Sequence, residues 1–300
     1  MGVKNGIINI VKLLLASLAF FAGIIAGGML STALGLQPPA VPAGMDMSRA
    51  MIYMLLTSPL LALALALVAR GLSGGFLLRT VVLSVLAWIA YTVNTQLEAS
   101  IFSTFASGIL FTIVDFAVPC LLCGAAVAFL FPAQAEEKNP ASTLRRFFGA
   151  HTATSWAWRL ALAAVAFMPI YWLFGSMVVP FTGKYYQKSM YGLQMPSTGR
   201  IVMILFVRSV LFLLACFPVI ALWNKSVQSL FLSLGFALYV LVGLVYMLSA
   251  DWMPVSIRLP HAIEILADEF TYAAVLVVLL FWRQAGTVKA QPASAGGVTT

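Results

Sequence analysis

The sequence has very few charged residues for its length. Charged side chains make up 9% of the 300 residues, whereas 62% are hydrophobic and the mean hydropathy is +1.01. A soluble globular domain carries about 25% charged residues, and a disordered chain carries far fewer apolar ones. The composition excludes both classes. It predicts an all-α polytopic membrane protein, because a helix of ~20 mainly apolar residues spans a bilayer.

Cysteine and histidine are also scarce, with three and two residues respectively. Cys120, Cys123 and Cys216 lie in apolar runs, where a thiol behaves as a small hydrophobic group, so neither a disulfide framework nor a redox pair is indicated. The sequence has no G-x-x-x-x-G-K-[ST] phosphate loop, which argues against an ATPase or kinase in this chain.

Apolar runs separated by charges or by Pro and Gly clusters predict about eight transmembrane helices. The first run, Leu13–Gln37, is uncharged and longer than the roughly 7–15 residues of a signal-peptide core, so we expect a retained span. The others are expected at approximately 50–69, 77–97, 107–131, 156–179, 200–222, 227–250 and 262–282.

Small residues and prolines recur inside these spans. Ala19, Gly23 and Gly27 are spaced by four in the first span, which predicts a packing face for a neighbouring helix. Prolines in the middle of four other spans predict kinks. These are Pro59, Pro119, Pro169 and Pro218.

Positive charge indicates the orientation. The formal charge of +8, from 17 Lys+Arg and 9 Asp+Glu, is typical of cytoplasmic loops in a membrane protein and does not indicate nucleic acid. With both termini cytoplasmic, inner segments hold eleven basic residues and outer segments five. The inner set is Lys4, Lys12, Arg70, Arg79, Lys138, Arg145, Arg146, Arg159, Lys225, Arg283 and Lys289. The outer set is Arg49, Lys184, Lys188, Arg200 and Arg258. We therefore expect a protein of an inner (plasma) membrane with cytoplasmic N and C termini.

The chain divides into four expected regions. Residues 1–131 form a first membrane half, 132–155 a cytoplasmic interfacial linker, 156–283 a second membrane half and 284–300 a disordered cytoplasmic tail. The linker contains Arg145-Arg146-Phe147-Phe148, a composition typical of a segment on an anionic membrane surface.

Two acidic pairs suggest an internal repeat. Glu98 and Asp115 are 17 residues apart, as are Asp251 and Asp268, and one offset of 153 relates both pairs. Because four is an even number of spans, the two halves would run in the same direction and be related by an axis along the membrane normal. The sequence predicts tandem parallel four-helix halves. The alternative is chance similarity between apolar helices.

Three of the charged residues inside predicted spans are expected at a shared depth, about 10–12 Å from the outer face at ~1.5 Å per residue. They are Asp115, Arg208 and Asp268. A charge at such depth costs ~2.5–3.5 kcal/mol, so it is usually paired and faces a bundle interior or a cavity. We expect a central substrate- or ion-binding site with Arg208 between the two carboxylates. The alternative is that the triad only holds the halves together.

The last predicted helix adds further polar groups. His261, Glu264 and Asp268, at i, i+3 and i+7, share one face, and Glu269 is expected on another. A His-x-x-Glu pair with one more carboxylate has the ligand types for a divalent metal. Because only one imidazole is available there, we expect no metal or other cofactor.

Two further groups are expected near the outer opening of this site. Asn94 and Glu98, stacked at i and i+4, extend the binding wall. The outer loop Phe181–Gly199 carries Lys184, Tyr185 and Lys188, which are candidates for a lid, although an aromatic belt at the lipid head groups is an equal alternative.

Three functional classes remain compatible with these patterns. The leading hypothesis is a carrier or lipid-handling protein with an outward-facing charged cavity, whose partners are membrane lipid and an anionic small molecule or lipid head group. The second is an intramembrane enzyme acting on a lipid or lipid-linked substrate, with His261 as general base oriented by Glu264. The third is a non-catalytic subunit that binds a partner protein.

Overall fold

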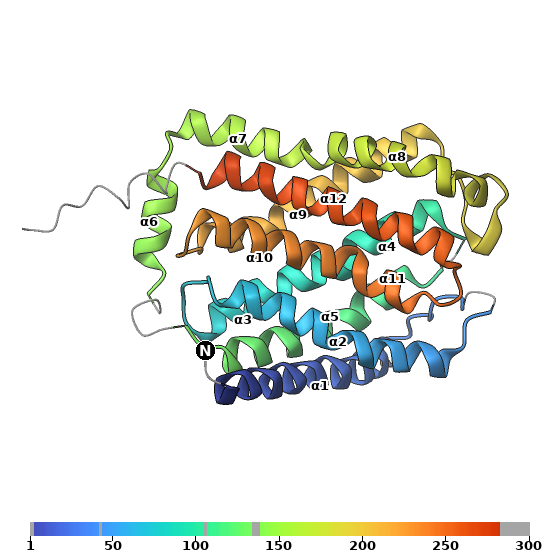
Figure 1. Cartoon of the computed structure of the whole chain (residues 1–300), viewed down its shortest axis with the longest axis horizontal. Helices are drawn as coiled ribbons and strands as arrows, with labels where there is room; N and C mark the ends of the chain where they lie inside the picture. Colours follow the sequence, from blue (N-terminus) through green and yellow to red (C-terminus); the bar gives the residue numbers. More distant parts are fainter. Residues whose placement is uncertain (1–2, 42–43, 105–106, 134–138, 283–300) are drawn as a thin grey trace, which may run out of the picture.

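The computed structural model describes residues 3–41, 44–104, 107–133 and 139–282. They form an all-α bundle in which long helices run side by side and one short helix crosses an end (Figure 1). Within these ranges, β structure is limited to two isolated antiparallel bridges. The expected tail, 284–300, lies outside the described residues.

The first half of the bundle contains four long helical segments. The third segment is continuous, because the π-helical turn η1 joins α3 to α4. The bounds are α1 (Val3–Ala33), α2 (Met47–Ala69), α3 (Phe76–Ala87), η1 (Trp88–Val93), α4 (Asn94–Phe102) and α5 (Ile109–Leu130).

The second half also contains long helical segments, which follow a short helix, α6. A π-helical turn, η4, again joins two helices into one segment. The bounds are α6 (Ala141–Gly149), α7 (Ala153–Val165), α8 (Phe167–Gln187), the 3₁₀ turn η3 (Met190–Gly192), α9 (Thr198–Ala221), α10 (Val227–Tyr239), η4 (Val240–Leu244), α11 (Val245–Ser249) and α12 (Val255–Leu280).

Seven helical segments in the described residues are long and apolar enough to cross a membrane. They are Lys4–Ala33, Met47–Ala69, Phe76–Phe102, Ile109–Leu130, Ala153–Gln187, Thr198–Ala221 and Val227–Ser249. The predicted polytopic helical membrane protein is thus confirmed. The eighth predicted span is a 26-residue helix, α12, packed beside α8 and α10. It is more highly charged than the seven, because it carries Arg258, Glu264, Asp268 and Glu269.

The helix of the fifth predicted span is longer than expected and is interrupted once. We expected it to end near residue 179, but α8 continues to Gln187, with Thr182 and Tyr185 buried in its last turns. The interruption at Val165–Ala166 follows from Pro169, because a proline ring clashes with the carbonyl four residues earlier. The free Phe167 N–H donates instead to Ser209 Oγ on α9, at 3.3 Å.

Helix α1 packs closely against α5 through its small residues. A Cβ on Gly23 would lie 2.3 Å from Pro119 Cα, and one on Gly27 would lie 2.1 Å from the Asp115 carbonyl oxygen. Only glycine permits this approach of two backbones, as in small-residue packing in membranes. The predicted packing face of the first span is confirmed at these two positions.

The two halves contact each other reciprocally. Helix α2 packs on α10 and α11 of the second half, while α9 packs on α3 and α4 of the first. The connections after α2 and α9 also pair: Ser73 N donates to Leu222 O at 2.9 Å, and Asn224 N donates to Gly71 O at 3.0 Å.

Helix α6 crosses the end of the bundle at which α1 begins and α12 ends (Figure 1). Phe147 is fully buried against Trp156 and Phe217, and the Ser73 and Thr143 hydroxyls are 3.0 Å apart. Arg145 and Arg146 are exposed. The expected linker thus contains a docked amphipathic helix, although its residues 134–138 lie outside the described part.

Candidate functional site

A cavity of about 780 Å³ lies between the two halves of the bundle. Its lining comes from α2, α4 and α5 of the first half and from α8, α9, η4, α11 and α12 of the second. Cavities of about 300–1,000 Å³ are typical binding sites for small molecules.

The part of this cavity nearest the end of the bundle opposite α6, which we call the upper part, is mainly apolar. It includes the connection after α1 and the one before α12, so the cavity extends toward the end of the bundle opposite α6. The lining there includes Pro38, Pro39, Met45, Met47, Trp252 and Met253. Methionine side chains are flexible and polarizable, so such a surface adapts to apolar groups of different shapes.

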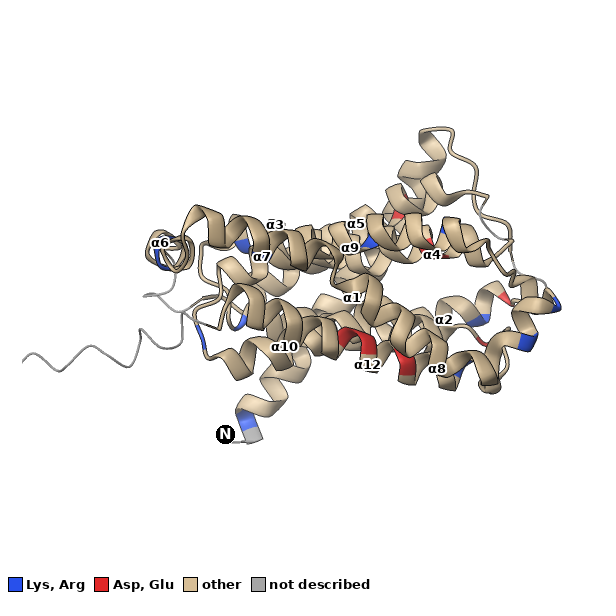
Figure 2. Cartoon of the chain, turned by 90° about the horizontal axis from the view of Figure 1, so that it is seen from above, with Lys and Arg blue, Asp and Glu red and all other residues tan. Residues whose placement is uncertain are grey.

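The lower part of the cavity, toward the middle of the bundle, carries ionisable groups. Figure 2 shows acidic segments in the middle of α12, while most basic residues lie toward the two ends of the bundle. The charged lining residues are Glu98, Asp115, Arg208, Glu264, Asp268 and Glu269, together with His261. We call this lower part the polar floor.

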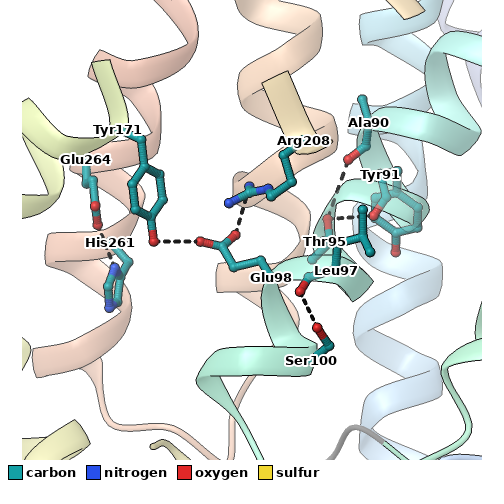
Figure 3. A network of polar contacts seen from close by, with 10 residues as sticks. All are labelled: Ala90, Tyr91, Thr95, Leu97, Glu98, Ser100, Tyr171, Arg208, His261 and Glu264. Atoms are coloured by element: carbon teal, nitrogen blue, oxygen red, sulfur yellow. Dashed lines mark hydrogen bonds and ion pairs between the residues drawn. The ribbon is translucent and has the colours of Figure 1, made fainter. Parts of the chain in front are cut away.

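Arg208 is the cation of the polar floor. Its Nη2 lies 2.9 Å from Glu98 Oε2, and the Tyr171 hydroxyl donates to Glu98 Oε1 at 3.0 Å (Figure 3). The guanidinium also lies 5.4 Å from the Phe167 ring centre, 5.6 Å from that of Tyr171 and 5.9 Å from that of Phe212. An ion pair and three ring faces compensate for the burial of a side chain that is only 2% exposed.

His261 is held by two neighbours at the side of the floor. Its Nδ1 lies 2.7 Å from Glu264 Oε2 and its Nε2 lies 3.1 Å from the Tyr186 hydroxyl. In a neutral imidazole, Nδ1–H donates to the carboxylate and Nε2 accepts from the tyrosine. Gly175 of α8 leaves room for Glu264, because a Cβ there would lie 3.1 Å from Oε1.

Three carboxylates of the polar floor have oxygens that lack a hydrogen-bond partner in the described residues. One oxygen of Asp115, one of Asp268 and both of Glu269 are buried without a hydrogen-bond partner in the described residues. Asp268 is 3% exposed and Glu269 is 0% exposed. An uncompensated buried carboxylate is expensive, so each such group needs an explanation.

The cavity brings together most residues predicted from the sequence. Asp115, Glu98, Arg208, His261, Glu264 and Asp268 all line it. Asn94 is not among its lining residues and is instead fully buried, with both amide atoms unpartnered in the described chain.

Two details of the expected site need correction. Arg208 pairs with Glu98, and no ion pair within the described ranges joins it to Asp115 or Asp268. Glu269 was expected on another face of its helix, yet it lines the same cavity as Asp268. Neighbours on a helix differ by about 100° in direction, so a cavity that curves around α12 reaches both side chains.

The candidate lid residues lie outside the cavity lining. Lys184 and Lys188 are exposed, whereas Tyr185 is buried and its hydroxyl lies 2.9 Å from Ser256 Oγ. From the same segment, Tyr186 and Leu193 line the cavity. Sequence reasoning also missed Tyr171, and a tyrosine spaced a few helical turns from Tyr186 was the available signal.

The described residues contain no group of three or more His, Cys, Asp and Glu side chains arranged to hold a metal ion. Cys120, Cys123 and Cys216 are buried free thiols. The polar floor therefore offers carboxylates, one guanidinium, one imidazole and tyrosine hydroxyls as its reactive or binding groups.

The chain matches no family model, no curated protein and no solved structure.

Proposed function

We propose that this protein is a carrier or lipid-handling protein of an inner (plasma) membrane, whose two halves enclose the cavity as a binding site open to the outer side. The observation that carries this proposal is the lining of the cavity, which is apolar in its upper part and ionisable in the polar floor. An amphipathic ligand, such as a small molecule or lipid with a polar head, matches both parts.

The proposal includes α12 as an eighth span with both termini cytoplasmic. Twenty-six residues at ~1.5 Å each reach about 39 Å, more than the ~30 Å hydrocarbon core. Three of its charged side chains, Glu264, Asp268 and Glu269, are buried, as expected for ionisable groups facing a bundle interior. The positive-inside rule supports placing the α6 end in the cytoplasm.

We also propose that the halves are tandem parallel repeats. The reciprocal packing of α2 and α9, and the π-helical turns η1 and η4 at matching places, support this relationship. In carriers built from repeats, the substrate site lies at the repeat interface and opens to each side as the repeats move against each other. The Arg208–Glu98 pair joins α9 to α4 across this interface.

Filling the cavity tests the proposal. Ala99 lines the cavity, so Ala99→Trp removes space from it. Ala161→Trp is the control, because that side chain is exposed on α7. Native mass spectrometry after mild extraction should detect a retained small molecule or lipid in the wild type and the control and lose it in Ala99→Trp. Equal spectra for all three proteins would argue against a bound ligand in the cavity and would favour a non-catalytic subunit.

A second candidate function is an intramembrane enzyme, favoured by the 2.7 Å contact between His261 and Glu264. A carboxylate that orients an imidazole is the usual arrangement around a general base. His261→Gln would then abolish turnover of the retained compound while preserving its binding. Retention of an unchanged compound by wild type and variant alike, with no product formed, would exclude this role.

A further inference from the structure

We infer that the ligand of the cavity is a lipophilic organic cation, whose positive group lies against Asp268 and Glu269. This inference rests on the proposed function, because it names the chemical class that the same cavity binds. It differs from the anionic ligand expected from the sequence, where Arg208 was thought to be available.

The polar floor contains more carboxylates than basic groups. Its five carboxylates are Glu98, Asp115, Glu264, Asp268 and Glu269. Glu98 forms an ion pair with Arg208, and Glu264 accepts a hydrogen bond from His261. The remaining three carboxylates form no such pair among the described residues. Four of their oxygens are buried without a hydrogen-bond partner, whereas Arg208 Nε is the one donor of the floor in that state, so acceptors are in excess.

Two of these carboxylates are adjacent in the sequence and deeply buried. Asp268 and Glu269 are 3% and 0% exposed, they line the cavity, and three of their four oxygens lack a hydrogen-bond partner. Burying a carboxylate without compensation is unfavourable, and an opposite charge in the cavity removes the penalty. A cation at this place would compensate both groups, whereas an anion would add repulsion.

The residues that line the cavity indicate which kind of cation it would bind. No group of three or more metal-ligating side chains occurs in the described residues, which argues against a metal ion as the bound charge. Tyr171, Tyr246 and Trp252 line the cavity, and aromatic faces attract organic cations. The methionines of the upper part accommodate an apolar body.

Arg208 does not oppose such a ligand strongly. Its charge is balanced by Glu98 at 2.9 Å, and its guanidinium is surrounded by the rings of Phe167, Tyr171 and Phe212. Only its Nε lacks a partner in the described residues, so most of the group is engaged by the protein, and Asp268 and Glu269 remain as the unpaired charges of α12.

Two probes with the same four phenyl rings and opposite charges test the inference: tetraphenylphosphonium and tetraphenylborate. Equilibrium dialysis with the full chain in detergent measures saturable binding of each, with protein-free micelles correcting for partition. We expect one saturable site for the phosphonium probe, and about tenfold or greater weakening in Asp268→Asn/Glu269→Gln. Asp46→Asn removes an exposed carboxylate at the start of α2 and should leave binding unchanged, because Asn is also a good N-cap.

Two further measurements distinguish the loss of a charge from a loss of folding and from a loss of space in the cavity. The amide substitutions remove charges that lack partners, so folding should be retained, and thermal unfolding checks this directly. Ala99→Trp, which changes no charge, should also abolish phosphonium binding.

Each other outcome separates this inference from the proposed function. Saturable binding of tetraphenylborate that is lost in Arg208→Gln would overturn the cationic ligand and leave the carrier proposal intact. Binding of neither probe, with a compound still retained in native mass spectra, would do the same. Binding of neither probe and no retained compound would overturn both proposals.

Discussion

Arg208 on α9 and Glu98 on α4 form an ion pair across the interface of the two halves, with 2.9 Å between Nη2 and Oε2. The partners differ in their access to solvent, since the side chain of Arg208 is 2% exposed and that of Glu98 is 30% exposed. This asymmetry determines which partner the protein tolerates losing.

Glu98→Gln should be more destabilising than Arg208→Gln. Losing the carboxylate leaves a buried guanidinium without its counter-charge, at about 3–5 kcal/mol, whereas the partly exposed carboxylate left by Arg208→Gln can be solvated. The double variant should lose less than the sum of the two single losses, because the partners are in direct contact. Thermal unfolding in detergent measures all four proteins. Strictly additive losses would show that the pair contributes no coupling energy.

Neighbouring glycines of α1 provide a matched packing test. Gly27→Ala places a Cβ 2.1 Å from the Asp115 carbonyl oxygen and should destabilise the α1–α5 contact by about 1–3 kcal/mol. Gly28→Ala has nothing within 4 Å and should be neutral or slightly stabilising, because alanine favours the helix. The unfolding temperatures of both variants check this, and equal values would contradict the close approach of the two helices.

Adjacent phenylalanines of α6 provide a second matched pair. Phe147 is fully buried, so Phe147→Ala should cost about 3–5 kcal/mol or release α6 from the bundle. Phe148 is 51% exposed, and Phe148→Ala should change stability much less. Protease cleavage within 139–152 should accelerate only in Phe147→Ala. Acceleration in both variants would indicate that α6 is not docked through Phe147.

Hydropathy was sufficient to predict the helices but not their ends. The seven apolar spans follow from composition because a membrane requires long apolar helices. The extension of α8 to Gln187 was missed, because Lys184 and Lys188 were interpreted as loop residues although charged side chains extend easily from the end of a helix.

Three of the buried charges were predictable, but their pairing was not. Asp115, Arg208 and Asp268 stand out because charge is rare in apolar spans. The partner of Arg208 depends on the rotation of α4, and the π-helical turn η1 changes that rotation just before Glu98. One additional residue in a turn rotates the rest of the helix by about 100°, which a regular period of 3.6 does not anticipate.

The central claim is a carrier or lipid-handling protein, and its carrier form requires the cavity to open to both sides of the membrane. Thr95 lines the cavity, so Thr95→Cys, in a background where Cys120, Cys123 and Cys216 are replaced by alanine, reports access to a membrane-impermeant thiol reagent. Lys184→Cys and Arg145→Cys mark the two ends of the bundle as single-sided controls. The account predicts that Thr95→Cys is labelled from both sides of sealed vesicles, while each control is labelled from one. Labelling of Thr95→Cys only from the side that labels Lys184→Cys would contradict a carrier and leave a fixed site open to one side.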